Sequence, residues 1–168
     1  MVNKFVFDTN VLIVANGHDT DDDTHASLEC RLMCLEFLMN CRELNIALDD
    51  LGLILLEYKP YMSFSGQPGV GDMFFKYLHD YQYASPKIHR VTITPLDTPP
   101  DDQERGFAEL PPNQLDLSDR KLLATAVQAQ ATVVNATESD WLEQQTLLEQ
   151  LAIALKQLCP EYATKKPK

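Results

Sequence analysis

The stretch KFVFDTNVLIVA, residues 4–15, decides the fold. Residues 4–7 form a short apolar run, which predicts a buried strand that ends at Asp8. Residues 9–15 predict a helix that begins directly after this acid. A strand that passes straight into a helix is the repeating unit of α/β proteins, whose sheets are built from parallel strands.

The remainder of the chain repeats this alternation. Further strands are predicted at residues 46–48, 90–94, 132–135 and 153–158, the last of which contains alanines that also permit a helix. Helices are predicted at residues 25–44, 50–58, 73–83, 118–130 and 141–151, and Asp49 or Asp50 can cap the second of them. The helix at residues 25–44 carries an apolar series on one side, formed by Leu28, Leu32, Leu35, Leu38 and Met39.

We therefore expect an α/β three-layer sandwich, in which helices flank a central parallel sheet. The 168 residues suit a single domain, residues 1–168, with a core of about residues 4–159. Residues 160–168 are expected to form a loose basic tail. Parallel sheets bind ligands at the carboxyl ends of their strands, so residues that follow the predicted strands are the first candidates for a site.

Composition restricts the function classes. No apolar run approaches the roughly 18 residues that span a bilayer, and Asp8 and Asn10 interrupt the N-terminal apolar stretch, which makes it a poor signal peptide. We expect a cytoplasmic protein with no membrane partner, whose four cysteines are reduced and mostly buried thiols. The net charge of −11 argues against non-specific binding of nucleic acid.

Five acids stand out against apolar surroundings or strand ends: Asp8, Glu57, Asp119, Glu138 and Asp140. Each has an ordinary structural explanation as well. Asp8 and Asp140 suit helix N-caps, and Asp119 suits the first turn of a helix, which Asp116 could also cap. A carboxylate that is half-buried, as we expect for Glu57, needs a partner or a metal ion.

Taken together, the acids resemble a known pattern. The segments FVFDTNVLIVA, LLEYKPY, SDRKLLATAVQAQATVV and NATESDW resemble, in order, the four acidic motifs of PIN-domain proteins. The most specific pieces are DTNVL at the first strand and DRKLLATA on the later helix. This resemblance implies a Rossmann-like fold. It also implies the activity of most known members, which are metal-dependent ribonucleases and include the VapC-type toxins of toxin–antitoxin pairs.

Matched position by position, the resemblance assigns the family's first three acids to Asp8, Glu57 and Asp119. Either Asp140 or Glu138 takes the fourth place, and Asp140 is the better candidate. Further residues are expected to orient carboxylates or waters, namely Thr9, Asn10 and Thr137. Carboxylate ligands suit Mg²⁺ or Mn²⁺, and these ions support phosphodiester hydrolysis.

The expected function is therefore that of a metal-dependent endoribonuclease, acting as a homodimer and restrained by an antitoxin protein. Two alternatives remain open: a catalytically inactive scaffold with the same fold, and an enzyme of the same chemistry that acts on DNA or on a small phosphate ester. Because the chain is acidic overall, contacts to an RNA substrate would come from local basic residues, namely Lys59, Lys76, Lys87, Arg90, Arg120, Lys121 or the lysines of the tail.

Overall fold

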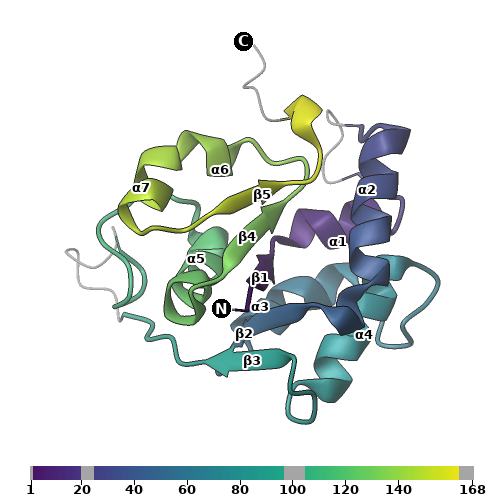
Figure 1. The fold of residues 1–168 in the computed structure, drawn as a ribbon, viewed down its shortest axis with the longest axis horizontal. Coiled ribbons are helices and arrows are strands. Elements are labelled where there is room, and N and C mark those ends of the chain that lie inside the picture. The colour runs from purple at the N-terminus through teal and green to yellow at the C-terminus, as the bar shows by residue number, and fades with distance from the viewer. Residues whose placement is uncertain (1, 20–24, 97–104, 163–168) are drawn as a thin grey trace.

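In the computed structural model, which describes residues 2–19, 25–96 and 105–162, five parallel strands form one sheet in the order β3-β2-β1-β4-β5 (Figure 1). The strands are β1 (Lys4–Phe7), β2 (Asn45–Asp49), β3 (Ile88–Val91), β4 (Thr132–Asn135) and β5 (Leu155–Gln157). The predicted α/β class and all-parallel sheet are confirmed. The last segment, residues 153–158, contains a strand and not a helix.

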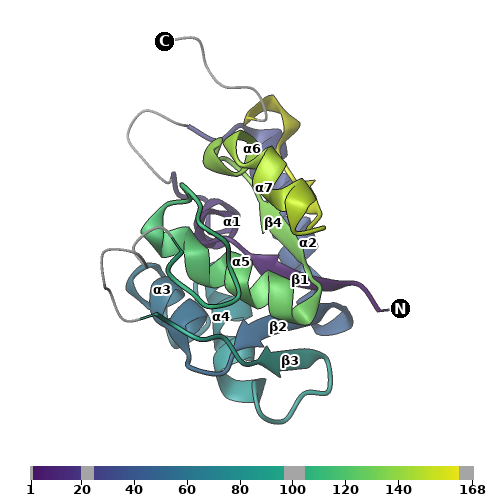
Figure 2. The same ribbon diagram turned by 90° about the vertical axis from the view of Figure 1, so that its left-hand side faces the viewer.

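Helices cover both faces of the sheet (Figures 1 and 2). One face is covered by α1 (Thr9–Ala15), α2 (Leu28–Met39), α3 (Leu53–Tyr58) and α4 (Val70–Tyr81). The other is covered by α5 (Leu117–Ala129), α6 (Asp140–Glu143) and α7 (Gln145–Gln150). Short 3₁₀ turns, η1 (Cys41–Glu43), η2 (Lys59–Tyr61) and η3 (Pro160–Tyr162), complete the described elements.

The order of the strands fixes where a ligand can approach. The chain proceeds outward from β1 through β2 to β3, then returns across the sheet to β4 on the other side of β1. Right-handed crossovers send the helices of these two halves to opposite faces. The carboxyl ends of β1 and β4 therefore open onto a crevice between diverging connections, which is the usual position of a ligand site in such sheets.

Local chemistry explains where several helices begin. Asp8 is the N-cap of α1, and its Oδ1 accepts a hydrogen bond of 3.2 Å from the Asn10 N–H. Asp49 ends β2, and its carboxylate accepts from the N–H groups of Leu53 and Ile54 at 2.8 and 2.9 Å. The predicted capping of this helix by an acid is thus confirmed. Gly52, with φ of +76°, allows the tight turn between them.

Several predicted elements differ in their bounds, among them the strand expected at residues 90–94, which is found at residues 88–91. The helix expected at residues 25–44 is shorter, because Ser27 caps α2 and Asn40 separates it from η1. The helix expected at residues 141–151 is divided at Gln144 into α6 and α7. The expected loose tail begins later, because residues 160–162 form η3, and residues 163–168 lie outside the described residues.

The core lies on both sides of the sheet, and its largest fully buried side chains include Phe7, Tyr58, Phe74 and Trp141. Trp141 belongs to α6, the helix that follows β4 in the chain. Within the described residues, none of the helices combines the length and the apolar character that crossing a membrane requires.

Candidate metal centre

An acidic hollow of about 170 Å³ lies at the carboxyl ends of β1 and β4. Its carboxylates come from segments that are far apart in the sequence: Asp8, Glu57, Asp116, Asp119, Glu138 and Asp140. Thr9, Asn10, Ile13, Tyr61 and Ser118 complete the lining. All five acids singled out in the sequence thus lie around one hollow.

Asp8 is the most deeply placed of these acids. It follows β1, is almost fully buried, and its Oδ2 accepts a hydrogen bond of 2.6 Å from the indole Nε1–H of Trp141. Burial raises the pKa of Asp8, whereas the hydrogen bonds from Trp141 and Asn10 act in the opposite direction. The carboxylate is therefore held in a fixed orientation at the floor of the hollow.

Three acids are close enough to share one ion. Asp116 precedes α5, Asp119 lies in its first turn, and Asp140 begins α6; one carboxylate oxygen from each lies within 4.8 Å of those of the other two. Asp116 occupies the N-cap position of α5, but its side chain makes no capping hydrogen bond there. Its carboxylate belongs to the group around Asp119 instead.

The electrostatics of this group are unfavourable without a cation. The pKa of Asp119 is raised to about 8, chiefly by burial and then by the negative charges of Asp8, Asp116, Glu138 and Asp140. The pKa of an ordinary Asp side chain is 3.8. Burial and the neighbouring negative charges therefore both disfavour the charged form of Asp119, and a divalent cation beside it would favour that form.

Glu57 is arranged differently from the other acids. It lies on α3 at the edge of the hollow, and its Oε2 accepts a hydrogen bond of 2.9 Å from Lys121 Nζ of α5. Both side chains are mostly covered, at 29% and 17% exposure. Part of the negative charge of the hollow is thus balanced within the chain.

Amide side chains hold the segment that carries the fourth acid. Asn10 Oδ1 accepts from the N–H groups of Ala136 and Thr137 at 2.9 and 3.1 Å, and Asn10 Nδ2 donates to Asn135 Oδ1 at 2.9 Å. Asn135 Nδ2 donates in turn to the Glu138 carbonyl at 2.7 Å. The turn between β4 and α6 is therefore held by these two amide side chains, which places Glu138 and Asp140 over the hollow.

Sequence reasoning misses several contributors. It indicates Asp116 only as a helix cap, although a spacing of three residues from Asp119 places both on one side of the helix start. The ion pair of Lys121 with Glu57 joins residues 64 positions apart, and no local pattern indicates it. The hydrogen bond from Trp141 to Asp8 joins two motifs that lie 133 positions apart, and it too has no local signal.

Arg120, one of the basic residues expected to contact substrate, is placed elsewhere. Its side chain is buried, and its Nε–H donates to the Leu115 carbonyl at 3.0 Å. Nη2 lies 3.4 Å from the Asn113 carbonyl. Arg120 therefore fastens the segment before α5 to the helix, which is a structural task and not the expected contact with substrate.

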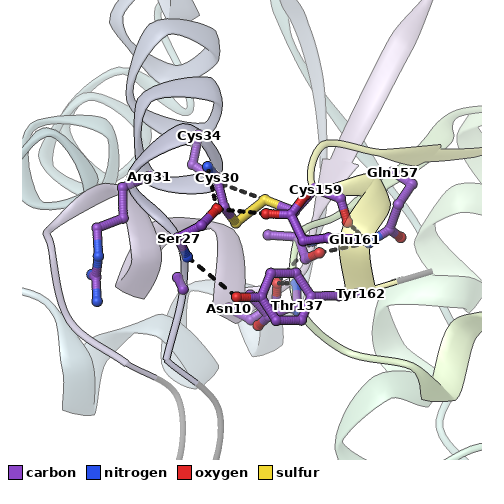
Figure 3. The surroundings of a disulfide bond; sticks show 12 residues. Asn10, Ser27, Cys30, Arg31, Cys34, Thr137, Gln157, Cys159, Glu161 and Tyr162 are labelled. Atoms are coloured by element: carbon purple, nitrogen blue, oxygen red, sulfur yellow. Dashed lines mark hydrogen bonds between the residues drawn. A yellow bond between two sulfur atoms is a disulfide. The ribbon is translucent and has the colours of Figure 1, made fainter. Parts of the chain in front are cut away.

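The prediction of reduced cysteines is wrong for two of the four. Cys30 of α2 and Cys159, which follows β5, form a disulfide between residues 129 positions apart (Figure 3). Cys34 and Cys41 are free and buried, and Cys34 Sγ lies 4.0 Å from Cys159 Sγ. The fold returns the end of β5 to the side of α2, a proximity that the spacing of the cysteines does not reveal.

The disulfide adjoins the support of the acidic hollow. Gln157, two residues before Cys159, donates through Nε2 to the Ala136 carbonyl at 2.5 Å, and its Oε1 accepts from Asn135 Nδ2 at 2.8 Å. In Figure 3, Gln157 lies on the Cys159 side of the disulfide, and Thr137 lies next to Asn10 and Tyr162. Burial raises the pKa of the neighbouring Cys34 thiol to about 12, so this thiol remains protonated.

Comparisons of the chain with known protein families, with curated proteins and with solved structures found no match.

Proposed function

We propose that the chain is a nuclease that hydrolyses RNA phosphodiester bonds with Mg²⁺ or Mn²⁺ held in the acidic hollow, as its sequence resemblance to PIN domains implies. The observation that carries the proposal is the convergence of Asp116, Asp119 and Asp140 within 4.8 Å, beside Asp8 and Glu138. Carboxylates so close together repel one another, and a bound cation relieves that repulsion.

The donor set fits a hard divalent ion. The described residues that line the hollow offer carboxylate oxygens from four connections of the sheet and include neither cysteine nor histidine, which favours Mg²⁺ or Mn²⁺ over softer metals. Asp116, Asp119 and Asp140 would hold the ion. When bound, such an ion polarises a phosphoryl oxygen and makes a bound water easier to deprotonate.

The other residues have distinct tasks in this proposal. Asp8, fixed by Trp141, would orient a water or the ion from the floor of the hollow. Glu57 would accept a proton from the attacking water, with Lys121 holding its carboxylate in position through their hydrogen bond. Asn10 maintains the turn before Asp140 through its backbone hydrogen bonds.

The test is cleavage of mixed pools of RNA and single-stranded DNA with Mn²⁺, with Mg²⁺ and with EDTA. We expect RNA cleavage that requires the metal and falls to the background rate in Asp119→Asn. Asp119 is a cleaner position than Asp8, because Asp8→Asn would also disturb the hydrogen bond from Trp141. The matched control is Asp80→Asn, because Asp80 is an exposed acid on α4 that pairs with Lys76. This variant should cleave like the wild type.

Each contrary result identifies a different function. Cleavage confined to DNA would retain the metal chemistry and change the substrate. Absence of cleavage together with no Mn²⁺ binding in titration calorimetry would overturn the proposal and favour the scaffold alternative. RNA cleavage that persists in EDTA and in Asp119→Asn would place the active site elsewhere in the protein.

A further inference from the structure

Helix α2 has two apolar faces, and only one of them is buried. Cys30, Cys34 and Leu38 are fully buried against the core. On the opposite side, Leu28, Leu32 and Met39 are 72%, 46% and 59% exposed, and Leu35 is half-buried. We call Leu28, Leu32, Leu35 and Met39 the α2 stripe. The sequence pattern predicts this apolar series, but its residues other than Leu38 do not enter the core.

The spacing of the α2 stripe is that of a helix-pairing seam. Its residues follow one another at intervals of four, three and four positions, which keeps them on one narrow side of the helix. This is the pattern of the a and d positions of a coiled coil, with Leu28 and Leu35 at d and Leu32 and Met39 at a. A helix that only covers a domain core requires a single apolar side.

The charges beside the stripe indicate what it pairs with. Glu29 and Glu36 occupy the e positions on one flank, and Arg31 occupies a g position on the other. In a parallel pair of α2 helices, Arg31 of one copy faces Glu36 of the second copy. In an antiparallel pair, Glu29 would face Glu36, so that like charges meet.

Arg31 already contacts the segment that precedes α2. Its Nη2 lies 2.5 Å from Asp19 Oδ1, and its Nη1 donates to the His18 carbonyl at 3.1 Å. A guanidinium has five N–H donors, so further hydrogen bonds to a carboxylate remain possible. The side chain is 25% exposed, and therefore reaches the surface beside the stripe.

We propose that the α2 stripe is the contact surface of a homodimer, in which the α2 helices of two copies lie side by side and parallel. The two-fold axis runs along the helices, so that each stripe residue meets its own counterpart and Arg31 pairs with Glu36 in both directions. Paired helices of about three turns bury roughly 1,000 Å², which lies at the small end of specific interfaces. We therefore expect a dissociation constant on the order of 10 µM.

Sedimentation equilibrium of the full chain, from low micromolar to about 100 µM, tests the association. The wild type should pass from monomer to dimer, and Leu32→Glu should remain a monomer while keeping its cooperative unfolding. The matched control is Leu51→Glu, since Leu51 is a 53% exposed leucine on the turn after β2. This control should dimerise like the wild type.

A second measurement fixes the orientation. In the parallel arrangement Met39 meets Met39, so a short bis-maleimide should link Met39→Cys into a covalent dimer, whereas the wild type has only buried free thiols. Glu36→Arg should raise the dissociation constant about fivefold, and less at high salt. A wild-type monomer throughout, a dimer that survives Leu32→Glu, or a control that dissociates equally would overturn the proposal. Absence of the Met39→Cys link would overturn the parallel arrangement.

Discussion

The acidic hollow and the cysteine cluster, formed by Cys30, Cys34 and Cys159, are built from neighbouring segments of the chain. The hollow brings negative charges together, whereas the cluster is uncharged. Both use segments that follow the carboxyl ends of strands, the hollow through β4 and the cluster through β5. The hollow gathers like charges, and their proximity helps to raise the pKa of Asp119 to about 8. The cluster of Cys30, Cys34 and Cys159 is buried and uncharged, and a covalent bond joins two of its members.

This difference shows how the fold can hold several carboxylates close together at the carboxyl ends of its strands. The turn that carries Glu138 and Asp140 brings like charges together, and Gln157, two residues before the disulfide-bonded Cys159, donates to the Ala136 carbonyl of the same turn. Strong packing and covalent restraint in one region thus offset unfavourable charge in the next. Breaking the restraint should therefore cost more stability than altering the charge.

Removing the disulfide should have the largest effect. Cys159→Ser releases a link between residues 129 positions apart, and the lost restraint on the unfolded chain should lower the free energy of unfolding by about 5 kcal/mol. Urea denaturation followed by circular dichroism measures this change. Dithiothreitol should destabilise the wild type by a similar amount and have no further effect on Cys159→Ser.

Cys41→Ala is the matched control for this experiment. Cys41 is also buried, but it is free, so its loss removes packing and no covalent bond. We expect a cost of about 1 kcal/mol, with sensitivity to dithiothreitol retained. Equal losses in the two variants would show that packing of the sulfur atoms, and not the covalent bond, stabilises this edge.

Neutralising Asp119 should have an intermediate effect that depends on pH. In the folded protein its pKa is about 8, against an ordinary value of 3.8, so between these pH values the fold retains a proton that the unfolded chain has released. Raising the pH therefore favours unfolding, and the destabilisation is complete above about pH 8. In EDTA, wild-type stability should fall on the order of 2 kcal/mol from about pH 5 to pH 8.

The measurement is thermal or urea unfolding across this pH range. Asp119→Asn should flatten the pH dependence and be more stable than the wild type at the alkaline end, whereas Asp80→Asn should retain the wild-type slope. Saturating Mn²⁺ should reverse the trend, because an ion binds the deprotonated carboxylate more tightly as the pH rises. A wild-type stability that rises with pH in EDTA would contradict the proposed repulsion.

Much of the fold follows from local rules that the sequence displays. The strand before Asp8 and the helix after it appear where expected, because an apolar run and an N-capping acid are both local signals. The division of residues 141–151 at Gln144 and the exposure of Leu28 and Leu32 on α2 were not predictable. Both features depend on how the helices pack against the rest of the fold.

In the candidate site too, local sequence patterns indicate some residues but not the contacts between segments that are far apart in the sequence. Asp8, Glu138 and Asp140 meet because parallel strands end at a common edge, and helices α3 and α5 bring Glu57 and Asp119 to the same hollow. The partner of Glu57 could not be predicted, since Lys121 reaches it from another helix across 64 residues. The bond between Cys30 and Cys159 escapes prediction for the same reason, because it depends on how β5 returns to α2.

The smallest expected effect concerns the ion pair of Lys121 and Glu57, in which the chain places a positive charge of its own at the hollow. Lys121 Nζ lies 2.9 Å from Glu57 Oε2 at the edge of the hollow, and its charge opposes the approach of a divalent cation. Lys121→Met should therefore lower the dissociation constant of Mn²⁺ about fivefold. Lys121→Arg, which keeps the charge, should bind Mn²⁺ like the wild type. Titration calorimetry at constant ionic strength measures both. Weaker binding in Lys121→Met would instead show that Lys121 holds Glu57 in the position that the metal requires, because loss of that arrangement would then outweigh the relief of repulsion.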